Sequence, residues 1–543
     1  MAGQAKPGGL GRIFIRKSVE QMHAEHEQGE LKKSLGALNL VLLGIGCIIG
    51  TGIFVLTGRA AAEFAGPGIM ISFIITGTLC ALVALAYAEL AAAIPVSGSA
   101  YSYSYASMGE IVAWVMGLLL VLEYGLAAST VAVGWSGYVV SFLSDYGIHI
   151  PAALQAAPGV EVKDHVTNEV IGVGVVNLPA LLAIGAVSVL LTVGVSESAT
   201  VNNVVVFIKV GVVIAFIIIG APYVKPELWQ PLIPAQVPAP PPGTDMSLGS
   251  QIWRALVDVV TAREDAPAYG MGGLITAAAT IFFAYIGFEA VSTAGAESKN
   301  PKRDMPIGIL GSLIICTILY ILTCAVLVGI VPYQQLNNPA PIAMAVDAIG
   351  LGWFATLVKI GAIAGLSSVM LVLLYGQTRI FYTMARDGLI PSVFANVHPK
   401  FKTPWVNTIL VGVLAAGFAG FMSLDALANL TNVGTLVAFA IICITVIYLR
   451  FARPDMERPF KLPVGVMLPV AGLGAILCAI LLMSLMAHVP TRTFFLIYLA
   501  VGFLLYFAYG MWNSKLGKGE VVLGHEPNPD LGATGVQKDH SKG

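Results

Sequence analysis

Two glycine-containing stretches hold the residues whose types and spacing are suited to binding a small polar molecule. Residues 44–54 contain four glycines within nine positions, and each glycine weakens a helix by about 1 kcal/mol relative to alanine. Residues 282–292 place Gly287 two positions before the carboxylate of Glu289. Both stretches lie in the middle of long apolar segments, where unpaired backbone groups are tolerated only if they line a cavity. We therefore expect a helix break in each stretch.

The first break would expose both kinds of backbone group. Free N–H groups at Gly50, Thr51 and Gly52 are suited to a carboxylate, because the N-terminal end of a helix carries partial positive charge. Free carbonyl groups near Ile48, at the end of the preceding half, are suited to an ammonium group. A molecule that carries both charges on one carbon, an α-amino acid, fits this geometry. Close packing between helices is the alternative explanation of these glycines.

The composition requires a membrane environment. Of the 543 residues, 57% are hydrophobic and only 11% are charged, and the mean hydropathy is +0.84, whereas soluble domains carry about 25% charged residues. The net charge of -1 creates no field toward nucleic acid, so we expect no nucleic-acid partner. The six cysteines show no C-x-x-C spacing, and we expect neither a metal site nor a cofactor.

The apolar segments predict an all-α, polytopic membrane protein. A crossing needs about 20 residues, and we count twelve such segments, at about 35–58, 68–94, 108–143, 177–194, 199–221, 271–296, 306–332, 351–384, 405–424, 429–449, 465–487 and 493–513. If the N-terminal tail is placed inside, the inside segments carry most of the 29 Lys and Arg residues. This positive-inside pattern predicts that both termini lie in the cytoplasm.

The two expected breaks lie five segments apart, which is the offset of two inverted repeats. Paired interruptions in corresponding positions point to the binding site of a transporter. The expected organisation is a cytoplasmic tail (1–34), a first repeat of helices 1–5 (35–221), an extracellular proline-rich loop (222–270), a second repeat of helices 6–10 (271–452), helices 11–12 (453–513) and a disordered cytoplasmic tail (514–543).

Several strings, in order along the chain, carry a likeness to a known group of proteins. They are GIGCIIGTGIF at 44–54, YAEL at 87–90, EY at 123–124 with GWSGY at 134–138, VNN at 201–203, KNPKRDMPIG at 299–308, and GQTR with MARDG at 376–388. They resemble the amino acid–polyamine–organocation (APC) superfamily of permeases and, within it, the cationic amino acid transporter branch.

The resemblance implies a LeuT-type fold, with 5+5 inverted repeats, two extra helices and alternating access. It also implies that residues 50–52 hold the carboxylate of a substrate. Carbonyl groups near Ile48, Phe283 and Ile286 would then hold its amine.

Lys209 lies midway along the fifth segment, where a charge is costly unless it is paired, hydrated or neutralised. A lysine there can gain and lose a proton near physiological pH, because burial disfavours its charged form. In sodium-coupled members of the LeuT-type fold, a cation bridges the first and eighth segments. We expect the Lys209 amine to take this place, bonding to a carbonyl near Gly46 and to the hydroxyl of Ser367 or Ser368. Protons would then be the coupling ion; a merely structural lysine is the alternative.

Four other intramembrane residues are candidates for the side-chain pocket or the gate. Glu123 would pair with Lys209 or with a protonatable network, or would face a cationic side chain of the substrate. Glu289 would serve the inner gate or pack the unwound segment. Tyr285 and Phe288 would cap the substrate or simply pack.

Two further charges lie near segment ends. Glu89 lies near the cytoplasmic end of the second apolar segment, where we expect it to reach water. Lys359 lies near the outer end of the eighth segment, where a long side chain usually extends to the membrane surface.

The preferred function is proton-coupled import of L-amino acids across the cell inner (plasma) membrane. An exchanger with the same site stays open, as does an amino-acid sensor built on a transporter fold. An enzyme is disfavoured because no metal-ligand cluster or G-x-S-x-G string occurs, and a pump is disfavoured because no G-x-x-x-x-G-K-[ST] string occurs. Small neutral substrates such as alanine and cationic ones such as arginine both remain open, as does the oligomeric state.

Overall fold

Most of the described chain is helical. The computed structural model describes residues 13–17, 34–96, 98–165, 167–194, 199–239, 247–261, 268–401 and 403–519. Backbone polar groups inside a bilayer must be paired within the chain, and a helix achieves this within one segment. The main elements are α2 (Ala37–Ile48), α3 (Thr57–Ala60), α4 (Ile69–Ala93), α5 (Ser99–Ser107), α6 (Glu110–Asp145), β1 (Glu161–Lys163), β2 (Val170–Val173), α7 (Leu178–Val193), α8 (Ala199–Gly220), α9 (Leu248–Val260), α10 (Gly270–Ile281), α11 (Pro301–Ile330), α12 (Pro341–Ala348), α13 (Gly352–Arg386), α14 (Trp405–Phe421), α15 (Leu424–Ala452), α16 (Val464–Met486), α17 (Val489–Leu505) and α18 (Met511–Asn513).

The helices are those of a multi-pass membrane protein. Nine helical segments of the described residues are long and apolar enough to cross a membrane, and α2, α7 and α14 are shorter apolar helices. One of the nine, Gly52–Ala93, includes a 3-10 turn at Gly66–Gly68, where Gly66 has a φ of 60°. The polytopic helical class is therefore confirmed. The count of twelve crossings and the inverted repeat remain predictions.

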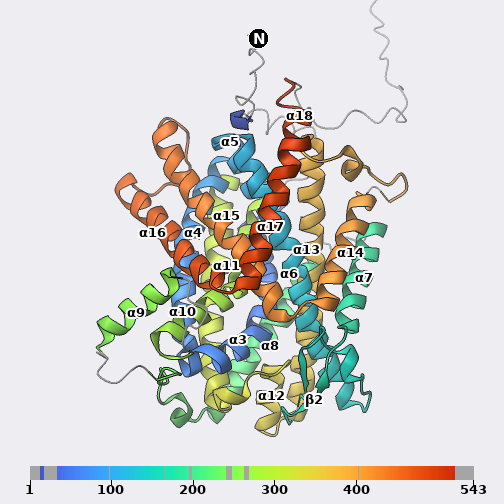
Figure 1. Ribbon diagram of the computed structural model, residues 1–543, viewed down its shortest axis with the longest axis vertical. Coiled ribbons are helices and arrows are strands. Elements are labelled where there is room, and N and C mark those ends of the chain that lie inside the picture. Colours follow the sequence, from blue (N-terminus) through green and yellow to red (C-terminus); the bar gives the residue numbers. More distant parts are fainter. Residues whose placement is uncertain are drawn as a thin grey trace, which may run out of the picture.

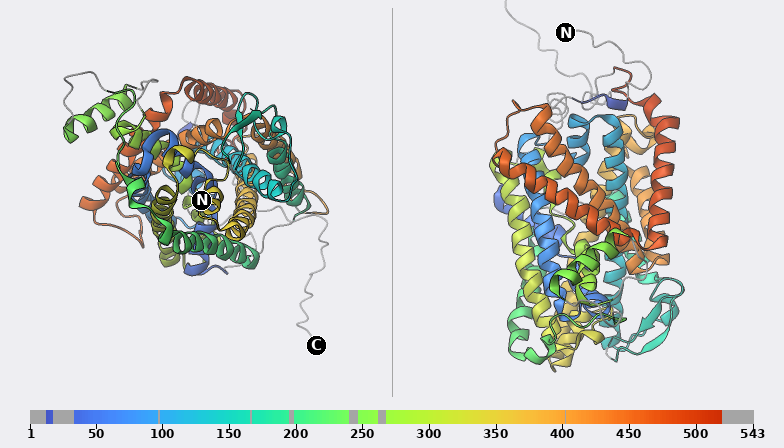
Figure 2. Two further views of the ribbon diagram at one scale, coloured as in Figure 1. Left: turned by 90° about the horizontal axis from the view of Figure 1, so that it is seen from below. Right: turned by 60° about the vertical axis from the view of Figure 1, so that its left-hand side comes forward.

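The bundle is elongated, and its two ends carry different elements. Helices α5 and α18 lie at one end, the α5 end, whereas α12 and the hairpin of β1 and β2 lie at the other, the α12 end (Figures 1 and 2). The two strands are antiparallel, with Val162 opposite Gly172. The Asn338 amide donates to the carbonyl of His165 at 3.2 Å, which joins the hairpin to the chain between α11 and α12.

Helices α6 and α13 pack along each other in the interior of the bundle. Helix α2 packs against α11 and α8, and α4 packs against α11 and α15. Small residues permit these close approaches: a Cβ atom on Gly376 of α13 would lie 3.2 Å from the ring of Tyr124 on α6. Helices α16 and α17 pack against α15 and expose apolar side chains, Ile476 and Leu504 among them. Such an apolar outer surface is suited to lipid.

The predicted loop 222–270 contains a helix that the sequence did not indicate to us. Its described part has a 3-10 turn at Pro226–Trp229 and the helix α9. The Ser247 hydroxyl caps α9 by accepting a hydrogen bond from the N–H of Ser250 at 3.4 Å. The expected tails, 1–34 and 514–543, lie mostly outside the described residues.

Two charges that we expected to reach the membrane surface are instead buried in ion pairs. Glu89 accepts from Arg450 Nε at 2.9 Å and from its Nη2 at 2.6 Å, and it also lies 3.2 Å from Arg458 Nε. Lys359 is only 1% exposed, and its amine lies 2.7 Å from a carboxylate oxygen of Asp145. Both predictions were wrong because an analysis of hydropathy considers each segment by itself, whereas the charged partners of Glu89 and Lys359 lie far away in the sequence.

Candidate functional site

The first predicted break lies between α2 and α3. Helix α2 ends at Ile48, and Ile49 takes an extended conformation with a ψ of 96°. Helical structure resumes at Thr51 and continues as a wide π-helical turn over Gly52–Leu56. The N–H groups in the first turn of a helix have no partner inside that helix. The break therefore presents backbone donors at residues 51–53, which overlap the predicted donors 50–52 at Thr51 and Gly52.

The second predicted break follows α10 and uses a backbone conformation that favours glycine. After a short 3-10 helix, Phe282–Tyr285, Ile286 is extended with a ψ of 131° and Gly287 has a φ of 122°. The Glu289 carboxylate accepts from the Gly287 N–H, at 3.1 and 2.9 Å from its two oxygens. The donor group that this break exposes is thus occupied by a carboxylate of the same chain.

The two breaks touch each other through their backbones. A Cβ atom on Gly52 would lie 2.2 Å from the Cα of Ala284, and one on Gly287 would lie 2.8 Å from the carbonyl carbon of Cys47. Only glycine permits such contacts, because a real Cβ atom would overlap the opposite chain. The predicted substrate-binding residues Ile48, residues 50–52, Phe283 and Ile286 are therefore brought together and are buried.

Side chains from two other helices bond to carbonyl groups at the breaks. The Tyr320 hydroxyl of α11 donates to the carbonyl of Ile48 at 2.8 Å. The Asn432 amide of α15 donates to the carbonyls of Ala279 and Thr280, at 2.9 and 3.2 Å. We did not single out either side chain from the sequence. Asn432 had a signal, a polar amide inside an apolar segment, whereas Tyr320 looked like any aromatic residue of a membrane helix.

Lys209 connects α8 to the end of α2. Its side chain is buried, and its amine donates to the carbonyl of Gly46, as we expected, and to that of Ile49 at 3.1 Å. Its aliphatic part crosses α13 where a glycine leaves room: a Cβ atom on Gly365 would lie 3.1 Å from the Cβ of Lys209. The amine thus binds the carbonyl groups that the end of α2 leaves without helical partners.

The two serines expected beside Lys209 lie on α13, and one of them is engaged elsewhere. The Ser367 hydroxyl accepts from Trp135 Nε1 at 2.9 Å and donates to the carbonyl of Ile363 at 2.8 Å. Ser368 is buried on the same helix. Its contact with Lys209 stays a prediction, and the Ile49 carbonyl provides the second bond that we assigned to a serine.

Two buried acids lie together behind the second break. The carboxyl groups of Glu123 on α6 and Glu289 interact electrostatically. Within the described residues, neither oxygen of Glu123 has a hydrogen-bond partner, and the same holds for the hydroxyls of Tyr87 and Tyr124. A second acid thus lies beside Glu123, for which we had weighed Lys209, a protonatable network and a cationic substrate as partners.

The aromatic residues of the second break pack against other helices. The Tyr285 hydroxyl donates to the carbonyl of Phe73 on α4 at 2.9 Å, and its ring contacts that of Tyr320. The ring of Phe288 lies 5.1 Å from that of Phe439 on α15. These contacts hold the unwound segment in place. A capping role toward a substrate stays a prediction for both residues.

Two cavities approach the breaks from opposite ends of the bundle. One cavity, of about 510 Å³, opens at the α12 end and is lined by Val55, Gly134 and Arg59, among others. The other, of about 410 Å³, opens at the α5 end and is lined by Tyr124 and Arg379, among others. We name them the outer and the inner cavity after the orientation that the sequence predicts. Neither of these cavities is lined by residues 48–52 or 283–286, so the breaks are closed to both.

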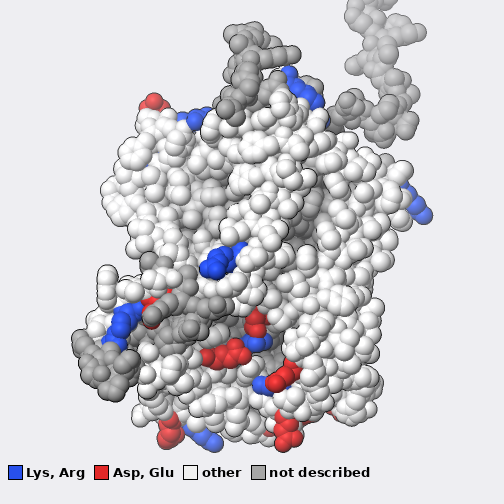
Figure 3. Space-filling view, in the orientation of Figure 1, with Lys and Arg blue, Asp and Glu red and all other residues white. Residues whose placement is uncertain are grey.

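Ion pairs line both cavities. In the outer cavity the guanidinium group of Arg59 contacts the carboxylate of Asp425, at the start of α15, and lies 3.3 Å from that of Glu63. In the inner cavity Arg379 lies 4.0 Å from Glu297. Figure 3 shows charged side chains gathered toward the α12 end, around a hollow in the surface.

Comparison with known proteins places the chain in a family. The family model of amino acid permeases matches residues 35–506. The chain belongs to the amino acid permease family. The match covers both breaks, Lys209 and the buried acids, so the whole candidate site lies inside the shared region. Membership of the APC superfamily, which the sequence strings indicated, is confirmed.

The relatives of this permease carry names that refer to different transported substances. It is 43% identical over 509 residues to the methylthioribose transporter of Bacillus subtilis and 44% identical over 510 residues to the branched-chain amino acid permease BcaP of the same organism, and each match spans 94% of this permease and 100% of the relative. It is also 37% identical over 449 residues to the vacuolar cationic amino acid transporter 4 of Arabidopsis thaliana, covering 82% of this permease and 68% of that protein.

Proposed function

We propose that this permease imports L-amino acids into the cell by proton-coupled alternating access. The substrate carboxylate binds the N–H groups of residues 50–52, and its amine binds the carbonyls of Ile48, Phe283 and Ile286. The observation that carries the proposal is the buried amine of Lys209, which bonds to Gly46 and Ile49 beside this site. A titratable group in contact with a broken helix can link proton binding to movement of that helix.

The proton acts on the connection between α8 and α2. Protonated Lys209 donates to two carbonyl groups and neutralises the partial negative charge at the end of α2. Loss of the proton removes one N–H donor and the positive charge, so the two helices separate more easily. Inward movement of one proton with one amino acid then uses the proton gradient to drive uptake. The membrane is the inner (plasma) membrane, with the α12 end outside and the α5 end inside.

The two cavities supply the pathways on either side of the site. Opening to the outside requires the pair of Arg59 and Asp425 to separate, since it joins the chain after the first break to α15. Opening to the inside requires the backbone contact between Gly287 and Cys47 to widen, since α2 runs from this contact toward the cavity at the α5 end. The closed contact between the breaks matches a state in which neither pathway reaches the site.

The substrate is a neutral amino acid with a small or branched side chain. The Glu289 carboxylate is already bonded to the Gly287 N–H, so it is not placed for a cationic side chain, and Glu123 interacts with this same acid. The branched-chain permease BcaP, 44% identical, supports this choice. Exchange of amino acids through the same site is the second candidate, because Lys209 is compatible with either mode.

Uptake into proteoliposomes tests the proposal. Labelled alanine and leucine are offered with an inward proton gradient, with unlabelled arginine in excess as competitor, for the natural permease and for Lys209→Met. We expect uptake driven by the gradient in the natural protein, little competition by arginine, and loss of the gradient response in Lys209→Met.

A second assay separates coupling from binding. Exchange of labelled for unlabelled substrate at equal pH on both sides needs the site and its movement but no gradient, so Lys209→Met should retain it. If Lys209→Met showed gradient-driven uptake at the rate of the natural permease, proton coupling through this residue would be refuted. Uptake that needs amino acid inside the vesicle would favour the exchanger.

A further inference from the structure

Helix α9 has one broad apolar face. Its sequence is LGSQIWRALVDVV, and with 3.6 residues per turn its polar side chains fall on one narrow side. These polar residues are Ser250, Gln251, Arg254 and Asp258. The remaining circumference is apolar, which is unusual for a helix in a loop between two membrane segments.

Only part of this apolar face packs against the protein. Ala255 and Val259 are buried, and α9 packs against α10 and α16. Trp253 is 68% exposed, and Ile252 and Val257 are each 38% exposed. The helix projects from the side of the bundle in Figure 1 and in the left view of Figure 2. A large apolar surface is therefore left for a partner outside the chain.

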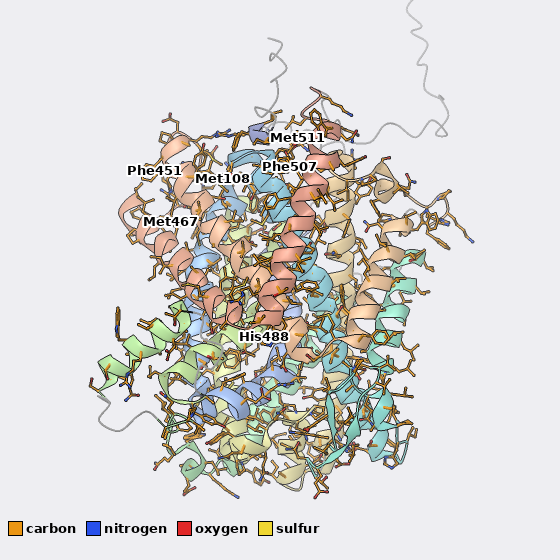
Figure 4. The ribbon with its side chains drawn as sticks, in the orientation of Figure 1. Met108, Phe451, Met467, His488, Phe507 and Met511 are labelled. Carbon is orange, nitrogen blue, oxygen red and sulfur yellow. The ribbon has the colours of Figure 1, made fainter. Side chains whose placement is uncertain are left out.

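The position of α9 identifies that partner. In Figure 4, α9 lies level with the labelled His488, in the turn between α16 and α17. This turn lies where two membrane helices end, so α9 lies at the depth of the membrane surface. The neighbouring helix α16 exposes Leu473 and Ile476, and the exposed face of α9 continues that lipid-facing surface.

The composition of α9 agrees with this depth. Tryptophan is enriched at the boundary between lipid and water, because its ring is apolar and its N–H is polar. Arg254 and Asp258 carry opposite charges, so α9 has no net attraction to anionic lipid. Burial of apolar area must therefore supply the free energy that holds α9 at the membrane surface.

We propose that α9 lies in the plane of the membrane surface at the α12 end, with Ile252, Trp253 and Val257 inserted among lipid chains. The helix packs against α10, the half-helix that leads to the second break. Lipid thereby holds the outer half of the broken segment at a fixed depth. This inference does not depend on the proposed function.

Fluorescence quenching tests the depth of each face of α9. The six native cysteines are buried, so a thiol-reactive, environment-sensitive dye labels an introduced cysteine selectively. The variants are Trp253→Cys and Val257→Cys on the apolar face and Gln251→Cys on the polar face, with the unlabelled natural protein as background. Each full-length variant is placed in vesicles of phosphatidylcholine with brominated chains, and iodide is added to the water in a second series.

We expect brominated lipid to quench the dye at positions 253 and 257 several-fold more than the dye at 251, and iodide to show the reverse order. Equal iodide quenching at all three positions would overturn the proposal, because α9 would then lie in water. Absence of both kinds of quenching at 253 and 257 would also overturn it, because a second copy or another protein would then cover the face.

Discussion

At the scale of single residues, the breaks depend on side chains that bind backbone carbonyl groups. Tyr320, Asn432 and Lys209 each donate to carbonyls that a broken helix leaves without partners. A buried carbonyl without a partner costs about 1–3 kcal/mol. These three side chains therefore stabilise an interruption that lipid alone would not permit.

Replacing Tyr320 with phenylalanine tests whether its hydroxyl positions the amine-binding carbonyl. Tyr320→Phe removes the bond to Ile48 and keeps the ring, so we expect a lower Tm and a raised KM for uptake. The matched control is Tyr498→Phe, because the Tyr498 hydroxyl also donates to a backbone carbonyl, that of Leu118, at 2.8 Å. It should lower the Tm without changing KM. The same KM in both variants would show that Tyr320 is only structural.

The sequence could predict residues whose chemistry contrasts with their surroundings. Lys209 stood out because an amine in an apolar segment is costly, and its bond to Gly46 was expected from the cation that bridges the first and eighth segments in sodium-coupled members of the LeuT-type fold. Tyr320 gave no such contrast. Glu89 and Lys359 were misjudged because their partners, Arg450 and Asp145, come together only in the fold.

At the scale of elements, the two breaks form a single unit. The glycines at 52 and 287 allow the two chains to touch, and each contact needs the absence of a side chain on one partner. The sequence predicted where each break would lie. It could not predict their direct contact, which depends on how α2 and α10 are placed by α11 and α15.

Adding one methyl group at the second break should disrupt this unit. Gly287→Ala places a Cβ atom at a φ that L side chains rarely adopt and 2.8 Å from the Cys47 backbone, so we expect a lower Tm and loss of uptake. Gly185→Ala on α7 is the control, because nothing lies within 4 Å of its added Cβ atom and alanine favours a helix. Thermal-shift and transport assays measure the two effects. A Tm and an uptake rate equal to those of the natural permease would refute the tight contact.

The sequence did not predict helix α9, for a reason different from the one that applies to the contact between the breaks. It is shorter than a membrane crossing and lies in a loop whose prolines drew attention first. Its apolar face has a helical period, but a surface helix of a soluble region has the same pattern. Only its position beside the turn after α16 distinguishes the two cases.

At the scale of the whole molecule, two cavities face opposite ends and the site between them is closed. The pair of Arg59 and Asp425 joins two elements across the outer cavity. Ion pairs at a surface contribute little, whereas partly buried ones hold elements together more firmly. The balance between outward-open and closed states should therefore depend on this pair.

Removing the charge of Arg59 should open the path from the outer cavity to the first break. In a background with Val55→Cys, which places a thiol on the cavity wall next to the first break at a position only 4% exposed, we expect Arg59→Gln to speed labelling by a membrane-impermeant maleimide several-fold. The control is Lys302→Gln, which breaks an exposed pair with Glu457 and should leave the rate unchanged. Equal rates for the two variants would show that the outer pair does not hold this path closed.

The bond between Glu289 and Gly287 makes the two breaks chemically unequal. With the Gly287 N–H taken by an internal carboxylate, the donors proposed for the substrate carboxylate lie at the first break. The head group of an amino acid in the proposed site then has one orientation, carboxylate toward Thr51 and amine toward Ile286. Mirror-image substrates held in this way direct their side chains to opposite sides of the α-carbon. Two contacts alone do not distinguish the mirror images, so one hand is selected by the walls that surround the side chain.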